Sequence, residues 1–255
     1  MLRRRIWSDG VARIRCSLSC RIGTAGWSIP AAEQEAFPLE GSHLERYATR
    51  FNAVEVNSSF YRPHRRMTYE RWAASVGDDF LFSVKLPKTI SHARRGEHTE
   101  ADIERFANEI AGLGGKLGVV LVQFPPSRVF QRCEVETLFA SLSSSLPCPL
   151  ACEPRHASWF APPAETLLAD LHVARVAADP PPADGAEAPG GWPGLRYHRL
   201  HGAPRIYYSR YEPHAIDILR DDLENGAHAA DVWCIFDNTA MGAATANALE
   251  LITRL

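Results

Sequence analysis

The sequence predicts an α/β fold in which a single domain forms a TIM-type (β/α)8 barrel. Eight short runs rich in β-branched and aromatic residues alternate with longer segments of helical period from residue 21 onward. No change in composition divides the chain, and its 255 residues lie within the size range of single-domain barrels. An open doubly wound sheet is the alternative, because it has the same alternation of strands and helices.

Each expected strand is a short apolar run that ends in polar or turn-forming residues. In chain order the strands are RIGTAGW (21–27), AVEVNSSF (53–60), FLFSVKLP (80–87), LGVVLVQFPP (117–126), PLACEPR (149–155), ARVAAD (174–179), LRYHRLHG (195–202) and DVWCIFDN (231–238). Helices are expected between them over 42–50, 68–77, 101–113, 134–145, 163–171, 214–225 and 241–254. The segment after the sixth strand, PPPADGAEAPGGWPG, is rich in Pro and Gly and is expected to form a loop.

Residues 1–20 show no clear period, so we expect an N-terminal extension before a barrel domain over 21–255. The formal net charge is −2, with 28 basic and 30 acidic side chains, which provides no global field for nucleic acid or anionic membranes. No long apolar run follows MLRRRIW, and the six cysteines form no CxxC pair. These features predict a cytoplasmic protein without a membrane span, a zinc knuckle or a disulfide framework.

The seventh expected strand carries charged and aromatic residues on one face. Alternation puts Tyr197, Arg199 and His201 on one side of YHRLHG and His198 and Leu200 on the other. In a parallel barrel one strand face meets the helices, and polar groups on the other face gather toward the C-terminal strand ends. We therefore expect Tyr197, Arg199 and His201 to point into the barrel.

The same alternation predicts inward polar residues near the ends of the other strands. They are Glu55, Asn57, Lys85, Gln123, Glu153, Arg155, Asp179 and Asp237. Burial of so many charges carries a desolvation cost of several kcal/mol per ion, whereas a purely structural barrel core uses Val, Ile and Leu. This set of inward polar residues therefore predicts a ligand site. The competing interpretation is a network of ion pairs that neutralise one another.

Aromatic residues follow several of these strand ends. Trp27, Phe60, Tyr61 and Trp159 are expected to form an aromatic rim, and the tyrosines of YYSRY (207–211) a second stacking wall. His92 follows the third strand and is interpreted as a solvated loop residue.

Seven motifs together resemble the YecE-like family, the domain-of-unknown-function family numbered 72. They are GTAGW, VEVNSSFYRPH, FSVKLPKTISH, LVQFPP, EPRHASWF, RLHG and FDNTAMGAATANAL, which occur in order over about 21–255. The resemblance implies a TIM-type barrel and supplies no reaction. It also implies roles for matching positions such as His156 and Asn238. Many relatives carry Asn-Asn-Asp after the last strand, whereas this chain has Asp237, Asn238 and Thr239.

The leading functional hypothesis is an acid/base enzyme, a hydrolase, lyase or isomerase, that acts on a small polar or anionic ligand. Glu55 and Glu153 are the expected pair of acid/base carboxylates, because unequal burial and neighbouring cations give such groups different pKa values. Lys85 and His201 complete the expected catalytic set. The expected ligand-binding residues are Trp27, Asn57, Tyr61, Gln123, Arg155, His156, Trp159, Asp179, Arg199, Asp237 and Asn238.

Two further hypotheses concern what binds at the strand ends. Phosphate sites in these barrels commonly use the loops after the seventh and eighth strands, which predicts an anion near Arg199 or His201. No cofactor is required, although Glu153, Asp179, His201 and Asp237 could hold Mg²⁺ or Mn²⁺.

A non-enzymatic binding module for a nucleotide or single-stranded nucleic acid is the alternative function. Basic residues and the aromatic rim would provide charge and stacking surfaces for such a ligand. The acids at the same strand ends disfavour a long phosphate backbone, and the oligomeric state is open.

Overall fold

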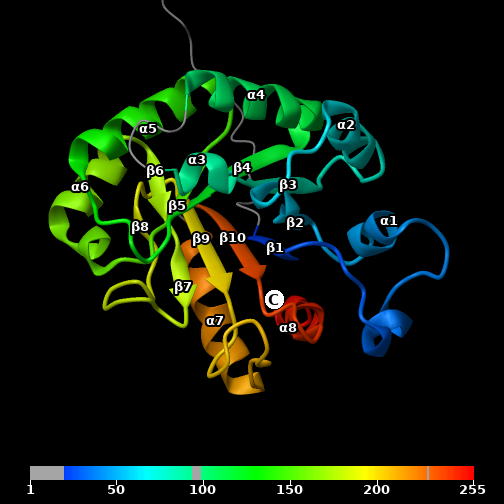
Figure 1. Cartoon of the computed structure of the whole chain (residues 1–255). Coiled ribbons are helices and arrows are strands. Elements are labelled where there is room, and N and C mark those ends of the chain that lie inside the picture. Colours follow the sequence, from blue (N-terminus) through cyan, green and yellow to red (C-terminus); the bar gives the residue numbers. More distant parts are fainter. Residues whose placement is uncertain (1–19, 94–98, 229) are drawn as a thin grey trace, which may run out of the picture.

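A computed structural model describes residues 20–93, 99–228 and 230–255 (Figure 1). The expected N-terminal extension, 1–20, therefore lies outside the described residues except for Cys20. That residue is the first of strand β1 (Cys20–Thr24).

The strands form two sheets whose neighbours run parallel, apart from β8. One sheet has the order β1-β10-β9-β7 and the other β2-β3-β4-β5-β6-β8. The strands span β1 (Cys20–Thr24), β2 (Ala53–Val56), β3 (Leu81–Lys85), β4 (Leu117–Gln123), β5 (Leu150–Glu153), β6 (Val173–Arg175), β7 (Ala177–Asp179), β8 (Gly190–Gly191), β9 (Leu195–Leu200) and β10 (Asp231–Phe236). The predicted α/β class with parallel strands is confirmed.

The closed ring of the predicted (β/α)8 barrel is not established by the strand pairing, which gives two separate sheets. The two sheets approach each other at two places. A single parallel bridge joins Ala25, after β1, to Glu55 in β2. The sixth expected strand is divided at Val176 into β6, which pairs with β5, and β7, which pairs with β9.

The helices lie outside the strands in Figure 1. All seven expected helices are present, with bounds that differ by a few residues. They span α1 (His43–Ala48), α2 (Arg66–Ala74), α4 (Glu100–Ile110), α5 (Arg132–Ser145), α6 (Pro162–Asp170), α7 (Pro213–Gly226) and α8 (Ala243–Ile252). A short α3 (Lys88–Ser91) and the two-residue β8 were not expected from the sequence, nor were the 3₁₀ turns η1 (Ala31–Ala36), η2 (Ser58–Phe60), η3 (Ala111–Lys116) and η4 (Ala157–Phe160).

Local sequence accounts for where several helices begin. Ser42 and Glu45 form a capping box at α1, and Thr99 and Asp102 form another at α4. Proline occupies the first turn of α6 and of α7, where its missing N–H leaves no hydrogen bond unmade.

The strands separate two apolar clusters. Val54, Phe82 and Val84 belong to the large cluster that includes residues from the helices. Residues at the alternate strand positions, such as Leu121, Ala151 and Ile235, form a smaller buried cluster. This alternation matches the predicted division into an outer face against helices and an inner face.

The connection after β7 has no α-helix, as its Pro- and Gly-rich composition predicts. Residues 180–189 run as turns and bends before β8, and a groove lies between β7, β9 and α7. In the part of the chain that the structure describes, no helix has both the length and the apolar character needed to cross a membrane.

Candidate functional site

Arg199, on the inner face of β9, is fully buried and binds three carboxylates. Its Nε and Nη2 donate to the two carboxylate oxygens of Glu55 at 3.0 and 2.7 Å. Nη1 donates to Glu153 Oε2 at 2.6 Å, and Nη2 also reaches Asp237 Oδ2 at 3.0 Å. A planar guanidinium suits this arrangement because it presents several N–H donors in fixed directions.

His201 lies two residues further along and bridges two of the same acids. Its Nδ1 is 3.0 Å from Asp237 Oδ2, and its Nε2 is 2.8 Å from Glu153 Oε1. We call Glu55, Glu153, Arg199, His201 and Asp237 the charged cluster.

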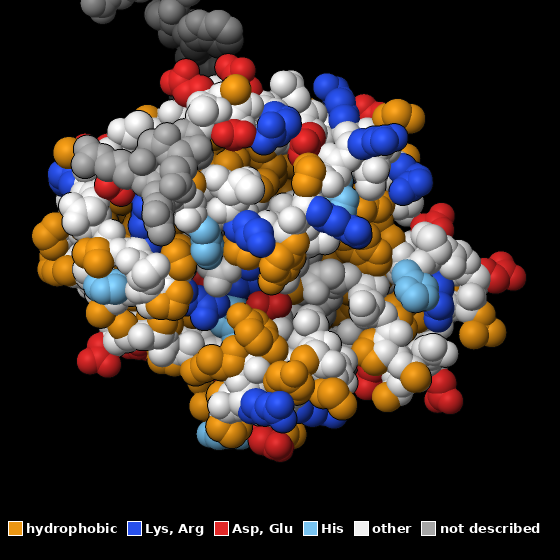
Figure 2. All heavy atoms as spheres, in the orientation of Figure 1, with side chains coloured by type: hydrophobic (Ala, Val, Ile, Leu, Met, Phe, Trp, Pro, Cys, Tyr) orange, Lys and Arg blue, Asp and Glu red, His pale blue; other side chains and the backbone are white. Residues whose placement is uncertain are grey.

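Arg155 lies beside the charged cluster, with its Nη2 at 2.7 Å from Glu153 Oε1. The same nitrogen is 3.0 Å from His201 Nε2. Arg155 is partly accessible, so it lies at the border of the buried network. Figure 2 shows acidic and basic side chains at the bottom of a depression near the centre of the face in view.

Two acids of the charged cluster, Glu153 and Asp237, are held in their ionised forms. Burial alone would raise the pKa of Glu153, but Arg199, His201 and Arg155 lower it to well below its ordinary value. The pKa of Asp237 is also lowered, because Arg199 and a hydrogen bond from His201 outweigh the effect of burial. These carboxylates therefore act as fixed negative charges near neutral pH.

Lys85, at the end of β3, differs from the other cations of the site. Its side chain is buried, with 5% of its surface exposed, and its Nζ lies 4.3 Å from the centre of the Phe60 ring. Among the described residues, no carboxylate lies within ion-pair distance of this ammonium. Burial and the nearby Arg199 lower the pKa of Lys85 to about 8, although the acids of the charged cluster oppose the change.

Tyr197 lies two residues before Arg199, on the same face of β9, and contacts the charged cluster through Glu55. Its hydroxyl lies 3.1 Å from Glu55 Oε2 and 2.8 Å from Ser83 Oγ. Its ring stacks on Trp233 with an interplanar angle of 7°. Glu55 therefore contacts both Arg199 and a hydroxyl group that is itself fixed by packing.

Tyr207 lies over the charged cluster, and sequence reasoning placed it only in a general wall of tyrosines. Its ring meets His201 edge-on, with 5.8 Å between ring centres, and its side chain is 41% exposed. Its backbone is in the left-handed region, with φ of 72°, which is unusual for a residue with a bulky side chain. Gly202, at the start of the same loop, also has a positive φ, and a Cβ there would collide with the Ser209 carbonyl.

Asp179 does not join the inward acids, contrary to the prediction. Ala174 and Val176 belong to the inner apolar cluster, so alternation puts Asp179 on the outer side. It lines a groove beside α7 instead. The four-residue metal set is therefore not assembled, and no group of three or more His, Cys, Asp or Glu among the described residues is arranged to hold a metal ion.

Of the predicted aromatic rim, Trp159 belongs to the core and Trp27 packs against it. Trp159 is 1% exposed and stacks on Phe124, and its indole N–H donates to the Arg128 carbonyl. Trp27 is half-buried and packs edge-on against Trp72. The rim prediction is wrong for Trp159, because the turn after β5 directs its indole against apolar side chains.

We expect Trp159→Ala to lower the free energy of unfolding by about 3–5 kcal/mol, because it removes a buried, stacked aromatic ring. Tyr61→Ala is the control, since Tyr61 is 68% exposed and should contribute little. Urea denaturation measures both. Equal stability of the two variants would contradict the core assignment of Trp159.

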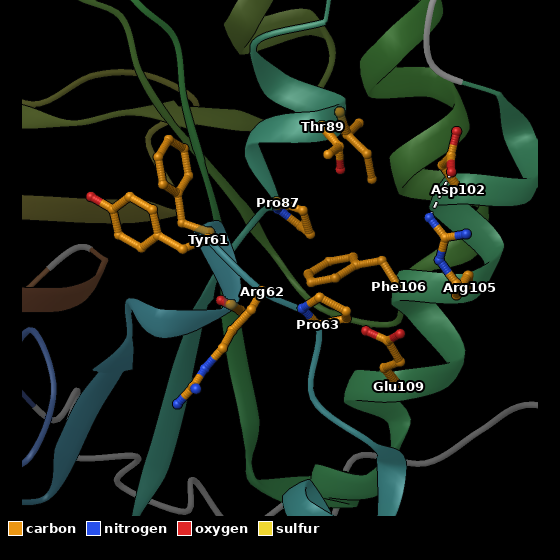
Figure 3. A pocket seen from close by; sticks show the side chains of 12 residues that line it. Tyr61, Arg62, Pro63, Pro87, Thr89, Asp102, Arg105, Phe106 and Glu109 are labelled. Carbon is orange, nitrogen blue, oxygen red and sulfur yellow. Dashed lines mark hydrogen bonds and ion pairs between the residues drawn. The ribbon is translucent and has the colours of Figure 1, made fainter.

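Tyr61 lines a cavity of about 140 Å³ between η2, α3 and α4, separate from the charged cluster. Figure 3 shows Phe106 extending from α4 toward Pro63, with Tyr61 and Arg62 on the opposite side of the cavity. Asp102 and Arg105 are paired across 2.7 Å at the α4 wall. Phe60 lines this cavity and also contacts Lys85, so its ring lies between the cavity and the Lys85 ammonium.

The remaining predicted ligand-binding residues have different surroundings. Gln123 pairs in register with Glu153 at the end of β4, and buried Asn57 Oδ1 has no hydrogen-bond partner in the described chain. His156 accepts from the Ser158 N–H and caps η4. Asn238 donates to the Ser209 carbonyl and to Asn247, so it fixes the loop that carries Tyr207.

Comparison with known proteins identifies the family. A family model described as "Protein of unknown function DUF72" matches residues 21–255. The chain belongs to the DUF72 family. The resemblance inferred from the motifs is thereby confirmed.

Named relatives of this DUF72 chain include the UPF0759 protein YecE of Escherichia coli K12, which is 33% identical over 172 residues. That match covers 65% of this chain and 61% of YecE. The UPF0759 protein YunF of Bacillus subtilis is 28% identical over 148 residues, covering 56% of this chain and 52% of YunF. The aligned region thus spans less than two thirds of either relative.

Solved structures of DUF72 proteins share the fold. A crystal structure from Thermotoga maritima has a TM-score of 0.75 and 25% identity, covering 92% of this chain and 98% of the other. One from Enterococcus faecalis has a TM-score of 0.76 and 22% identity over the same shares. The DUF72 likeness supports the α/β architecture and does not assign a reaction.

Proposed function

We propose that this chain is an acid/base enzyme that acts on a small polar or anionic ligand, in a TIM-type barrel closed around the charged cluster. The observation that carries the proposal is the buried ammonium of Lys85, which has no ion-pair partner among the described residues. The oxygen of a ligand would complete its contacts.

Closure of the ring is supported at both places where the sheets meet. The Gly26 N–H donates to the Glu55 carbonyl at 2.8 Å, beside the Ala25–Glu55 bridge. Gly23 lets β1 and β2 approach, since a Cβ there would collide with the Ala53 carbonyl. On the other side, the Val176 N–H donates to Cys152 of β5 just before β7 pairs with β9.

The division of roles follows from the hydrogen bonds. Glu55, Glu153 and Asp237 are occupied by Arg199, so they serve best as fixed charges that hold the site's geometry. Lys85 is then the better proton-transfer group. With a pKa of about 8, it has substantial protonated and neutral fractions near physiological pH.

In this scheme protonated Lys85 binds a ligand oxygen and stabilises negative charge that develops on it. Neutral Lys85 accepts a proton from the ligand, as a general base does. Arg155, which borders the cluster, is placed to bind an anionic group of the same ligand. Hydrolase, lyase and isomerase reactions all use such steps.

The expected anion contact at Arg199 receives less support than one at Lys85. All three guanidinium nitrogens of Arg199 already donate to carboxylates, so an anion would have to displace one of them. Lys85 and Arg155 are the more accessible cations.

A binding module for a nucleotide or single-stranded nucleic acid is also less well supported. Such ligands stack on accessible aromatic rings, whereas Trp159 and Phe60 are buried and Trp27 packs on Trp72. Tyr61, Tyr207 and Tyr208 are the exposed rings nearby.

Ligand binding at Lys85 is tested by calorimetric titration with inorganic phosphate and with acetate. We expect binding to the wild type that weakens at least about tenfold in Lys85→Met, because the ammonium supplies the main attraction. The matched control is Lys88→Met, which removes an exposed lysine from the neighbouring helix and should bind like the wild type. Equal affinity in Lys85→Met and wild type, or no binding of either anion, would contradict the site.

Catalysis is tested separately by incubating the protein with a mixture of small hydroxy acids, keto acids and sugar phosphates in D2O. The proposal expects deuterium incorporation or consumption of a compound with wild type and Lys88→Met, and none with Lys85→Met. Anion binding at Lys85 without any turnover across such mixtures would favour the binding-module alternative.

A further inference from the structure

A second groove lies on the outer side of the strands, away from the charged cluster. It has a volume of about 390 Å³ and lies between β7, β9 and α7, where the connection after β7 has no helix. Its walls are mainly apolar and include Ala177, Leu200, Tyr211, Ile216 and Leu219. Its size is within the range of small-molecule sites, about 300–1,000 Å³.

His198 is a polar residue within this apolar wall. It occupies the outer face of β9, the face that usually packs against helices, and only 3% of its surface is exposed. Its Nε2 has no hydrogen-bond partner among the described residues and is 3.8 Å from Asp222 Oδ2. A buried ring nitrogen without a hydrogen bond is costly, so a ligand that bonds to it would recover free energy.

The charged residues that line the groove are all acidic. Asp179, Glu187 and Asp222 line it, and no Lys or Arg belongs to its described lining. Asp222 is partly neutralised, because Arg196 binds its other oxygen at 2.9 Å. Burial lowers the pKa of His198 to about 4, so the imidazole is neutral near pH 7 and adds no positive charge.

We propose that this groove binds a small ligand with an apolar body and a protonated amine. The apolar body would lie against Leu200 and Leu219. The ammonium group would face Asp179 and Asp222 and could donate a hydrogen bond to neutral His198. This site is independent of the Lys85 site, which has the opposite charge preference.

Titration with 2-phenylethylamine, followed by two-dimensional NMR, tests the groove. We expect saturable shifts of the His198 and Leu219 signals, and affinity at least about tenfold higher than for 3-phenylpropanoate, which has the opposite charge. Ala215→Trp should abolish binding, because Ala215 lines the groove and an indole would fill it. Ala74→Trp, which enlarges an exposed alanine on α2, is the matched control.

His198→Phe keeps an aromatic ring and removes both ring nitrogens, so it should weaken amine binding, while Lys85→Met should leave it unchanged. The groove proposal is overturned if 2-phenylethylamine gives no saturable shifts, if 3-phenylpropanoate binds equally well, or if both Ala215→Trp and His198→Phe bind like the wild type. Loss of binding in Lys85→Met would place the amine at the other site and would also overturn it.

Discussion

Arg199→Met is expected to lower the free energy of unfolding by at least about 3–5 kcal/mol, a large fraction of the roughly 5–15 kcal/mol that stabilises a typical domain. The guanidinium binds Glu55, Glu153 and Asp237, all of which are buried. Its removal leaves three carboxylates together without their central cation. Chemical denaturation, or the fraction of soluble protein, measures the effect.

The matched control is Arg132→Met, which breaks an exposed pair with Glu136 and should cost less than about 1 kcal/mol. Adding Glu55→Gln to Arg199→Met should restore part of the lost stability, because it removes one uncompensated charge. If Arg199→Met unfolds at the same urea concentration as Arg132→Met, the charged cluster does not have the importance assigned to it.

Lys85→Met is expected to have the opposite effect and to stabilise the protein at neutral pH. The pKa of Lys85 falls from 10.5 to about 8 on folding, which corresponds to roughly 3 kcal/mol of unfavourable burial of the protonated form. A methionine fills similar space without the charge. Stability gained when a polar residue is removed is typical of groups retained for function.

The sign of the pH dependence follows from the same shift. Below about pH 8 both folded and unfolded chains hold the Lys85 proton, and the folded state bears the full penalty. Between about pH 8 and 10.5 only the unfolded chain holds the proton, so stability rises with pH.

Urea denaturation over this pH range therefore has a defined outcome. The stability difference between Lys85→Met and wild type should shrink as pH rises from about 8 to 10.5. Lys88→Met should track the wild type throughout. A Lys85→Met variant that is less stable than wild type at pH 7 would show that Lys85 holds the fold together.

Alternation along the strands correctly predicted which charged side chains meet on the inner face. Glu55, Glu153, Arg199, His201 and Asp237 were all expected on the inner face, and the structure brings them into one hydrogen-bonded cluster. This works because strand geometry leaves only two faces for a side chain. That Lys85 has no carboxylate partner among the described residues depends on distances between strands, which alternation does not provide.

The errors arose where the chain leaves the strands. Trp159 follows a strand end, but a 3₁₀ turn directs it onto Phe124 in the core. Asp179 was expected on the inner face because it lies at a strand end. Val176 lies on the inner face, so alternation puts Asp179, three residues later, on the outer face. The loop after β7 was expected from its composition, but the groove it leaves beside His198 depends on how α7 packs.

The pKa of Lys85, measured by NMR titration of lysines labelled at the ε-carbon, tests the central claim most directly. Lys85→Met assigns the signal, and Lys88 provides an exposed lysine in the same spectrum. The account predicts that Lys85 titrates near pH 8, because its ammonium is buried and no carboxylate of the described residues lies within ion-pair distance. A Lys85 that titrates at pH 10 or above, like the exposed lysine, would contradict it.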